Sequence, residues 1–368
     1  CFQVDPADNQ LPYTEQVVHR QVQMRITDPS EVLKLWIMGG DVDYQARHLT
    51  REDWDLLAAS QETGDYDLLP VQSDYTTVLC PNQTALDGPL RAFCANRNVR
   101  RALSLAIDRQ RIAGVVYDGL ARPRQFGPSS LSPQYDAAAA GAWLDHDPAQ
   151  ANALLDGEGY GTLDGESFRT HPGGGRLELR IDLADGSDVE ELLMVIEDLR
   201  GVGIRAIYNE WGSAMQERNP QILMERAVGN EVQAVYGRAR GGVLPLLNPQ
   251  ATLCLAPVLS PGPAWRAWRE EVPAPHVEEP PEGHWLRAVW RAWDALARSG
   301  EAAFREAQFA EILRLHAEWL PYIGVCGDVQ GPLVVARRLR NIPRDYCLPA
   351  SLETRYEALV PLQTLFWE

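Results

Sequence analysis

The chain has 368 residues, of which 45% are hydrophobic and 23% are charged. These values are typical of a globular protein, and the length is sufficient for two compact lobes. A formal net charge of -17 argues against nucleic acid as a partner, because phosphate binding needs clustered Lys and Arg. No run approaches the roughly 18 uninterrupted apolar residues that a membrane-spanning helix needs.

Residues 1–80 predict short strands alternating with helices. The clearest helix begins after Asp28, carries Leu33, Trp36 and Ile37 on one side, and ends at the glycine pair that starts at Gly39. A linker at residues 81–84, with the sequence PNQT, then leads into the next region.

Residues 98–112, with the sequence NVRRALSLAIDRQRI, predict an amphipathic helix. Its apolar residues recur at helical spacing and form one stripe, which we expect to lie on a core: Val99, Ala102, Leu103, Ala106 and Ile107. Its polar residues fall mostly on the other face: Arg100, Arg101, Ser104, Asp108 and Arg109. The helix is expected to span residues 99–108.

The pattern farther along the chain alternates strands and helices. Helices are expected at residues 147–155, 188–200, 285–297 and 302–320, and strands at 177–181, 205–208, 321–325 and 332–335. A Pro-rich stretch at residues 257–281 interrupts this order and is interpreted as a loop region. This alternation predicts an α/β fold.

The residues of these segments and their order along the chain resemble those of the extracellular solute-binding proteins of family 5, the peptide, nickel and oligosaccharide receptors of ABC importers. Residues 98–112 and the VVYDGLARP run at 115–123 resemble the signature segment of that family. DPADNQLPY at 5–13 and DPAQANALL at 147–155 match two further family motifs, with Asp8 where one branch has Gly. The resemblance continues to the LFW run at 365–367 and covers nearly the whole chain.

The resemblance implies a periplasmic-binding-protein-like α/β fold of type II, from the large group whose full-length members carry an extra domain. Two lobes are joined by two crossings. We expect residues 1–84 in lobe 1, 85–324 in lobe 2 and 325–368 returning to lobe 1, with the hinge near Asn82 and Cys326. Residues from Gln3 onward resemble the middle of the family's chain, so lobe 1 is expected to be incomplete and Cys1 is not interpreted as a lipid-bearing residue.

Catalytic and metal-binding motifs were not found in the sequence. It has no Gly-x-Ser-x-Gly, Walker or His-Glu-x-x-His motif, and no Cys-x-x-Cys pair, so an enzyme, a metal and a cofactor are not predicted. His316 is interpreted as a surface or core histidine, and paired carboxylates such as Glu190 and Glu191 as solvated faces or helix caps.

The six cysteines leave two alternatives open. In an extracytoplasmic protein the nearest pairs along the sequence, Cys80 with Cys94 and Cys326 with Cys347, are permitted to form disulfides. Isolated buried thiols that pack as small apolar side chains are the other interpretation.

Candidate ligand residues come from the tryptophans and from one segment. Trp265 and Trp268 lie in the Pro-rich stretch, and Trp211 follows a predicted strand, where indoles would be available to stack on a solute. Trp285, Trp290 and Trp293 share one predicted helix and are expected in the core.

Peptide receptors of the family typically carry aspartates late in the second lobe, but residues 231–245 of this chain have none. Tyr236, Arg238 and Arg240 stand there instead. This favours an anionic or hydroxyl-rich ligand over a free-amine peptide, so an oligosaccharide or a modified peptide is expected at least as much as a peptide.

The function expected from the resemblance is a monomeric receptor that captures a peptide or oligosaccharide outside the cytoplasm and delivers it to an ABC permease. It would be periplasmic or anchored as a lipoprotein on the outer face of the membrane. The alternative is a ligand sensor or chaperone that uses the same clamp without transport.

Overall fold

The computed structural model describes residues 29–45, 49–184, 189–209, 232–246, 249–256, 259–342, 344, 348–350 and 366–367. The chain forms two compact units, one from Cys1–Asp74 with Val329–Glu368 and a larger one from Tyr75–Asp328. It therefore passes between the units twice, at residues 74–75 and 328–329. Asn82 and Cys326, the predicted hinge residues, both lie inside the larger unit.

The smaller unit is built on a sheet whose strands come from both ends of the chain. The sheet order is β1-β9-β2-β11, and β2 pairs antiparallel with β9 from Tyr66↔Ala336 to Gln72↔Gln330. Helix α1 ends before the glycine pair, as predicted, with Gly40 at φ 78. The elements are α1 (Pro29–Met38), β1 (Tyr44–Gln45), η1 (Arg51–Asp53), α2 (Trp54–Ala59), α3 (Gln61–Gly64), β2 (Tyr66–Ser73), β9 (Gln330–Ala336), β10 (Leu339–Arg340), β11 (Leu348–Ala350) and β12 (Phe366–Trp367).

The larger unit contains a mixed sheet in the order β4-β8-β3-β7-β5-β6 among the described residues. β3 pairs antiparallel with β7 and β8, whereas β5 pairs parallel with β6 and β7. The strands are β3 (Tyr75–Pro81), β4 (Arg122–Pro123), β5 (Glu178–Leu183), β6 (Arg205–Asn209), β7 (Ala234–Arg240) and β8 (Ile323–Gly327).

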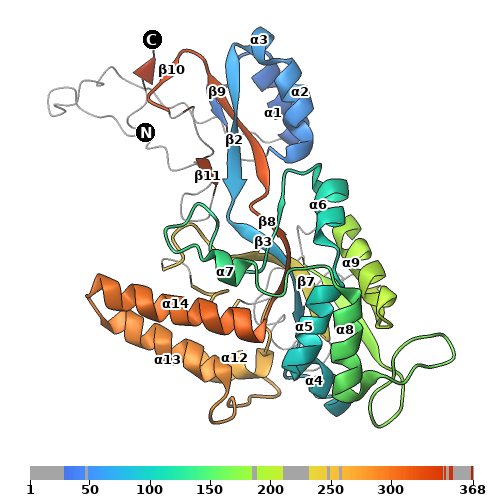
Figure 1. The fold of residues 1–368 in the computed structure, drawn as a ribbon. Coiled ribbons are helices and arrows are strands. Elements are labelled where there is room, and N and C mark those ends of the chain that lie inside the picture. The colour runs from blue at the N-terminus through green and yellow to red at the C-terminus, as the bar shows by residue number, and fades with distance from the viewer. Residues whose placement is uncertain are drawn as a thin grey trace. The chain divides into compact units, whose positions relative to one another are not determined.

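Helices cover this sheet on two sides, and α13 and α14 pack side by side (Figure 1). The helices are α4 (Gly88–Ala95), α5 (Arg97–Ala106), α6 (Arg109–Tyr117), α7 (Ala137–Ala140), α8 (Pro148–Leu155), η2 (Asp156–Tyr160), α9 (Val189–Gly201), α12 (Pro263–Arg269), α13 (Trp285–Arg298) and α14 (Ala302–Trp319).

Strand alternation decides which side chains meet which helices. Val235 and Ala239 of β7 belong to the apolar cluster that includes Trp285, Trp290 and other residues of α13 and α14. Because successive side chains point to opposite faces, Tyr236 between them faces the other side of the sheet. Trp285 and Trp290 are buried there, which confirms their expected place in the core.

The predicted helix at residues 99–108 is two helices with a break. α5 ends at Ala106, and Asp108 caps α6 by accepting a hydrogen bond from the Arg111 N–H at 3.0 Å. The apolar stripe is buried as predicted, but the expectation that the polar residues face outward is wrong for Arg100, Ser104 and Arg109, which are also buried.

Backbone carbonyls explain why these arginines are buried. Arg100 donates to the carbonyl oxygens of Cys94, Trp319 and Leu320 at 2.7–3.1 Å. Arg109 donates to that of Gly324 at 2.8 Å. Buried guanidinium groups are tolerated because these acceptors replace water.

Two other local predictions need correction. Pro263–Arg269 is a helix and not a loop, since Pro263 occupies the first turn, where its missing N–H has no cost. Glu191 is completely buried and is not a solvated carboxylate. The described cysteines, Cys80, Cys94, Cys254 and Cys326, are free and buried, so the alternative of small buried side chains holds and a Cys80–Cys94 bridge does not form.

Candidate ligand-binding site

Strand β7 carries three of the predicted ligand residues on one side of the sheet. Tyr236, Arg238 and Arg240 alternate along the strand, and Arg240 pairs with Tyr75, the first residue of the larger unit. Arg238 is exposed, and its guanidinium lies over the Tyr75 ring at 4.8 Å. We call the surface formed by Arg238, Arg240 and Tyr75 the arginine end of β7.

Tyr236 differs from the arginines because it has no exposed surface. Burial and the nearby Glu191 carboxylate raise the pKa of its hydroxyl well above the ordinary value, so it stays neutral. A solute can approach Arg238 from solvent, whereas it can reach Tyr236 only by displacing the atoms that cover it. Tyr236 therefore belongs to the polar interior behind the strand.

That interior contains a carboxylate that the sequence interpretation did not identify as buried. Glu191 on α9 accepts hydrogen bonds from the Thr77 hydroxyl at 2.7 Å and the Tyr117 hydroxyl at 2.8 Å. The Cys326 N–H donates to the same Thr77 oxygen at 3.1 Å. A hydroxyl on β3 thus joins a helix to β8. Glu191 lies at helical spacing with buried Val195 and Leu199, which was the available signal.

The tryptophan pair lies on α12. Trp265 is buried, and its indole N–H donates to Glu278 at 3.3 Å. Trp268 is partly buried and stacks on Trp290 with ring centroids 6.2 Å apart. Only Trp268 has surface available to a solute.

The two groups of predicted residues lie at opposite ends of the β3–β7 ladder. The start of α12 is joined to the chain just after β3, through Gln83 N–H to Pro261 O at 2.7 Å and Ala264 N–H to Thr84 Oγ1 at 3.2 Å. Arg240 pairs at the other end of β3. Seven strand residues span about 20 Å, so the structure does not bring the tryptophans and the arginine end into one site.

Of the remaining predicted residues, two lie within or next to strands of the larger unit and one lies outside the described part of the chain. Trp211 is outside the described residues. Asn82 comes directly after the last residue of β3, whereas the crossing at residues 74–75 is at the start of that strand. The side-chain amide of Asn82 donates to Val232 O at 2.9 Å. Cys326 lies in β8.

Over the described residues, no group of three or more His, Cys, Asp or Glu side chains is arranged to hold a metal ion. His316 is buried, and its Nε2 lies 2.7 Å from the Thr252 carbonyl oxygen, which requires that nitrogen to be the donor.

Comparison with known proteins identifies the fold. The family described as bacterial extracellular solute-binding proteins, family 5 Middle, matches residues 8–234. The chain belongs to this family. No curated protein sequence matches it significantly. In the described residues, no helix is both long enough and apolar enough to cross a membrane.

Solved structures have the same mixed α/β fold. The oligopeptide-binding protein OppA aligns with a TM-score of 0.76 and 24% identity, covering 92% of this chain and 55% of that chain. MelB from Agrobacterium fabrum C58 in complex with stachyose gives 0.65 and 18%, covering 92% and 50%. NikA from Brucella suis in complex with Fe(III)-EDTA gives 0.62 and 17%, covering 93% and 61%. The chain thus spans 50–61% of the length of these structures.

Proposed function

We propose that this protein is the solute-binding receptor of an ABC importer, which captures a peptide or an oligosaccharide outside the cytoplasm and delivers it to a permease. The observation that carries the proposal is the family match over residues 8–234. The division into two units with two crossings supports it, because a closing clamp needs few connections that bend. We place the bending at residues 74–75 and 328–329.

The arginine end of β7 supports a ligand that is anionic or rich in hydroxyl groups. Arg238 is exposed and held over Tyr75, so it presents a fixed guanidinium with donors in one plane. Residues 231–245 contain no aspartate that would receive a peptide amine. A modified peptide or an oligosaccharide satisfies this surface better than a free peptide amino end.

Thermal-shift titration tests the ligand class. The probes are unmodified di- to pentapeptides, the same peptides with acetylated amino ends, and stachyose. Acetylated peptides or stachyose should raise the melting temperature. Arg238→Gln should weaken the affinity derived from this titration about tenfold or more. Arg298→Gln, an exposed arginine at the end of α13, is the matched control. Stabilisation by unmodified peptides alone would contradict the ligand proposal.

Delivery is tested separately from binding. A permease and ATPase encoded beside this gene should, after purification into vesicles, hydrolyse ATP faster when the liganded protein is added. Binding without any stimulation would favour a sensor or chaperone on the same fold.

A further inference from the structure

The loop after α12 folds back on that helix and borders an open pocket on the larger unit. The helix ends in two hydrogen bonds typical of a Schellman motif, from Glu271 N–H to Trp268 O at 3.4 Å and from Val272 N–H to Ala267 O at 3.0 Å. Glu278 N–H then donates to Ala264 O at 3.3 Å and returns the loop to the helix. The walls of the pocket are therefore fixed by backbone contacts.

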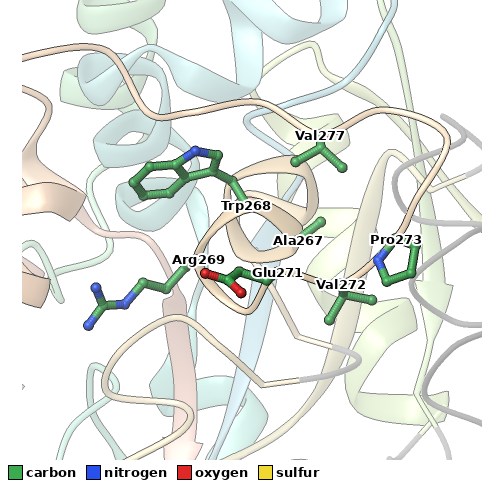
Figure 2. A pocket seen from close by; sticks show the side chains of 7 residues that line it. All are labelled: Ala267, Trp268, Arg269, Glu271, Val272, Pro273 and Val277. Carbon is green, nitrogen blue, oxygen red and sulfur yellow. The ribbon is translucent and has the colours of Figure 1, made fainter.

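The pocket, which we call the α12 pocket, has a volume of about 560 Å³. Figure 2 shows the side chains that line it, with Trp268 and Val277 along one edge and Val272 and Pro273 at another. Ala267, Arg269 and Glu271 complete the lining. This volume falls within the range of pockets that hold a small ligand, about 300–1,000 Å³.

Trp268 offers a flat surface to this pocket. Arg287 lies over its ring at 5.5 Å, and Trp290 stacks on it. Arg287 and Trp290 are one turn apart on α13, so both contacts come from that helix, and the same indole lines the pocket. Across the described residues, the Trp268 indole N–H also has no acceptor.

Glu271 adds a carboxylate to the lining of the same pocket. It is exposed, and among the described residues no side chain or backbone group pairs with it. Its φ is 54, at the position after a helix where glycine is usual, because a side chain is strained in the left-handed region. A glutamate at this position costs some backbone stability relative to glycine.

We propose that the α12 pocket binds a sugar ring, as a site separate from the solute site of the receptor. The C–H groups of a pyranose pack on the part of the indole that lines the pocket, and its hydroxyl groups donate to Glu271 and accept from the Trp268 N–H. Val272, Pro273 and Val277 contact the apolar patches of the ring. The proposal does not depend on the arginine end of β7, which lies at the other end of the β3–β7 ladder.

Two matched valine variants test the site. Maltotriose, cellotriose and chitotriose are titrated into the protein, and binding is followed by saturation-transfer NMR of the sugar protons. Val277→Asp places a charge at an exposed position of the pocket and should weaken binding at least tenfold. Val115→Asp makes the same change at an exposed position of α6 and should leave binding unchanged. Equal affinity of both variants would overturn the proposal, as would the absence of binding by all three sugars.

Variants of Glu271 distinguish a loss of the carboxylate from a loss of folding. Asn tolerates the left-handed region, so Glu271→Asn keeps the turn and removes the charge. Glu271→Gly relieves the strain and removes the side chain. Both should weaken sugar binding about threefold to tenfold while the melting temperature is maintained or rises. Unchanged sugar affinity in both variants would overturn the role of Glu271.

Arg238→Gln distinguishes this site from the proposed solute site. Sugar binding that survives Arg238→Gln and fails in Val277→Asp supports the α12 pocket. Sugar binding that fails only in Arg238→Gln places the sugar at the arginine end of β7, which overturns this inference and leaves the receptor function intact.

Discussion

Replacing Arg100 by methionine should destabilise the larger unit by about 2–4 kcal/mol. The guanidinium is completely buried and donates to the carbonyl oxygens of Cys94, Trp319 and Leu320. Methionine fills a similar volume but donates nothing. Each of three acceptors left without a donor costs about 1–3 kcal/mol, and release of the guanidinium from its buried site offsets part of the sum.

Urea unfolding followed by far-UV circular dichroism measures this loss. The midpoint should move to lower urea with an unchanged slope, since the native surface is the same. Arg101→Met is the control, because Arg101 is only partly buried and donates to one backbone carbonyl, that of Glu318 at 3.0 Å, and to the partly buried side-chain oxygen of Asn98 at 3.4 Å. It should cost about 1 kcal/mol or less. An Arg100→Met variant within about 0.5 kcal/mol of the parent would refute the reasoning.

Three further predictions concern pH and backbone space. Burial lowers the pKa of His316 to about 4 from the ordinary 6.5, so the unfolded state binds the proton first, and up to about 3 kcal/mol of stability is lost as pH falls from 6.5 to 4. In His316→Gln the urea midpoint should change less with pH over that range than in the parent protein. The same change with pH in both proteins would contradict this prediction. Gly241→Ala would place a Cβ 1.8 Å from the Gly127 carbonyl oxygen and should cost several kcal/mol in urea unfolding, whereas Gly114→Ala meets nothing and should gain about 0.5–1 kcal/mol. Glu271→Gly should raise stability by about 1 kcal/mol in the same assay, and a loss would show that its left-handed conformation is not strained.

Regular elements were predictable where local spacing decides them. The expected helix at 188–200 is α9, Val189–Gly201, and the expected helix at 302–320 is α14, Ala302–Trp319. The strand predicted at 205–208 is β6, Arg205–Asn209. Apolar residues at regular intervals, with a glycine or proline at the ends, were sufficient for these elements.

Charged residues in the interior were not predictable from spacing. Arg100 and Glu191 look like surface residues until the carbonyls of α14 and the hydroxyls of β3 and α6 are brought to them. Those partners are distant in sequence and follow only from the tertiary structure. The candidate site shows the same limit. The sequence gives no sign that Arg238 and Trp268 are far apart, but Arg238 lies toward one end of the β3–β7 pair and the helix that carries Trp268 is joined to the other end.

The pairing of β2 has a consequence for the order of folding. Both strands beside β2, β9 and β11, follow residue 328 in the chain, so β2 has neither neighbour until synthesis passes that point. The larger unit lies between them as one continuous stretch, and its own β3–β8 pairing places Thr76 opposite Gly327. Folding of that stretch brings the two ends together and shortens the loop that β2 and β9 must close. We therefore expect the larger unit to fold first, with the unpaired β2 edge exposed to association until the last strands arrive.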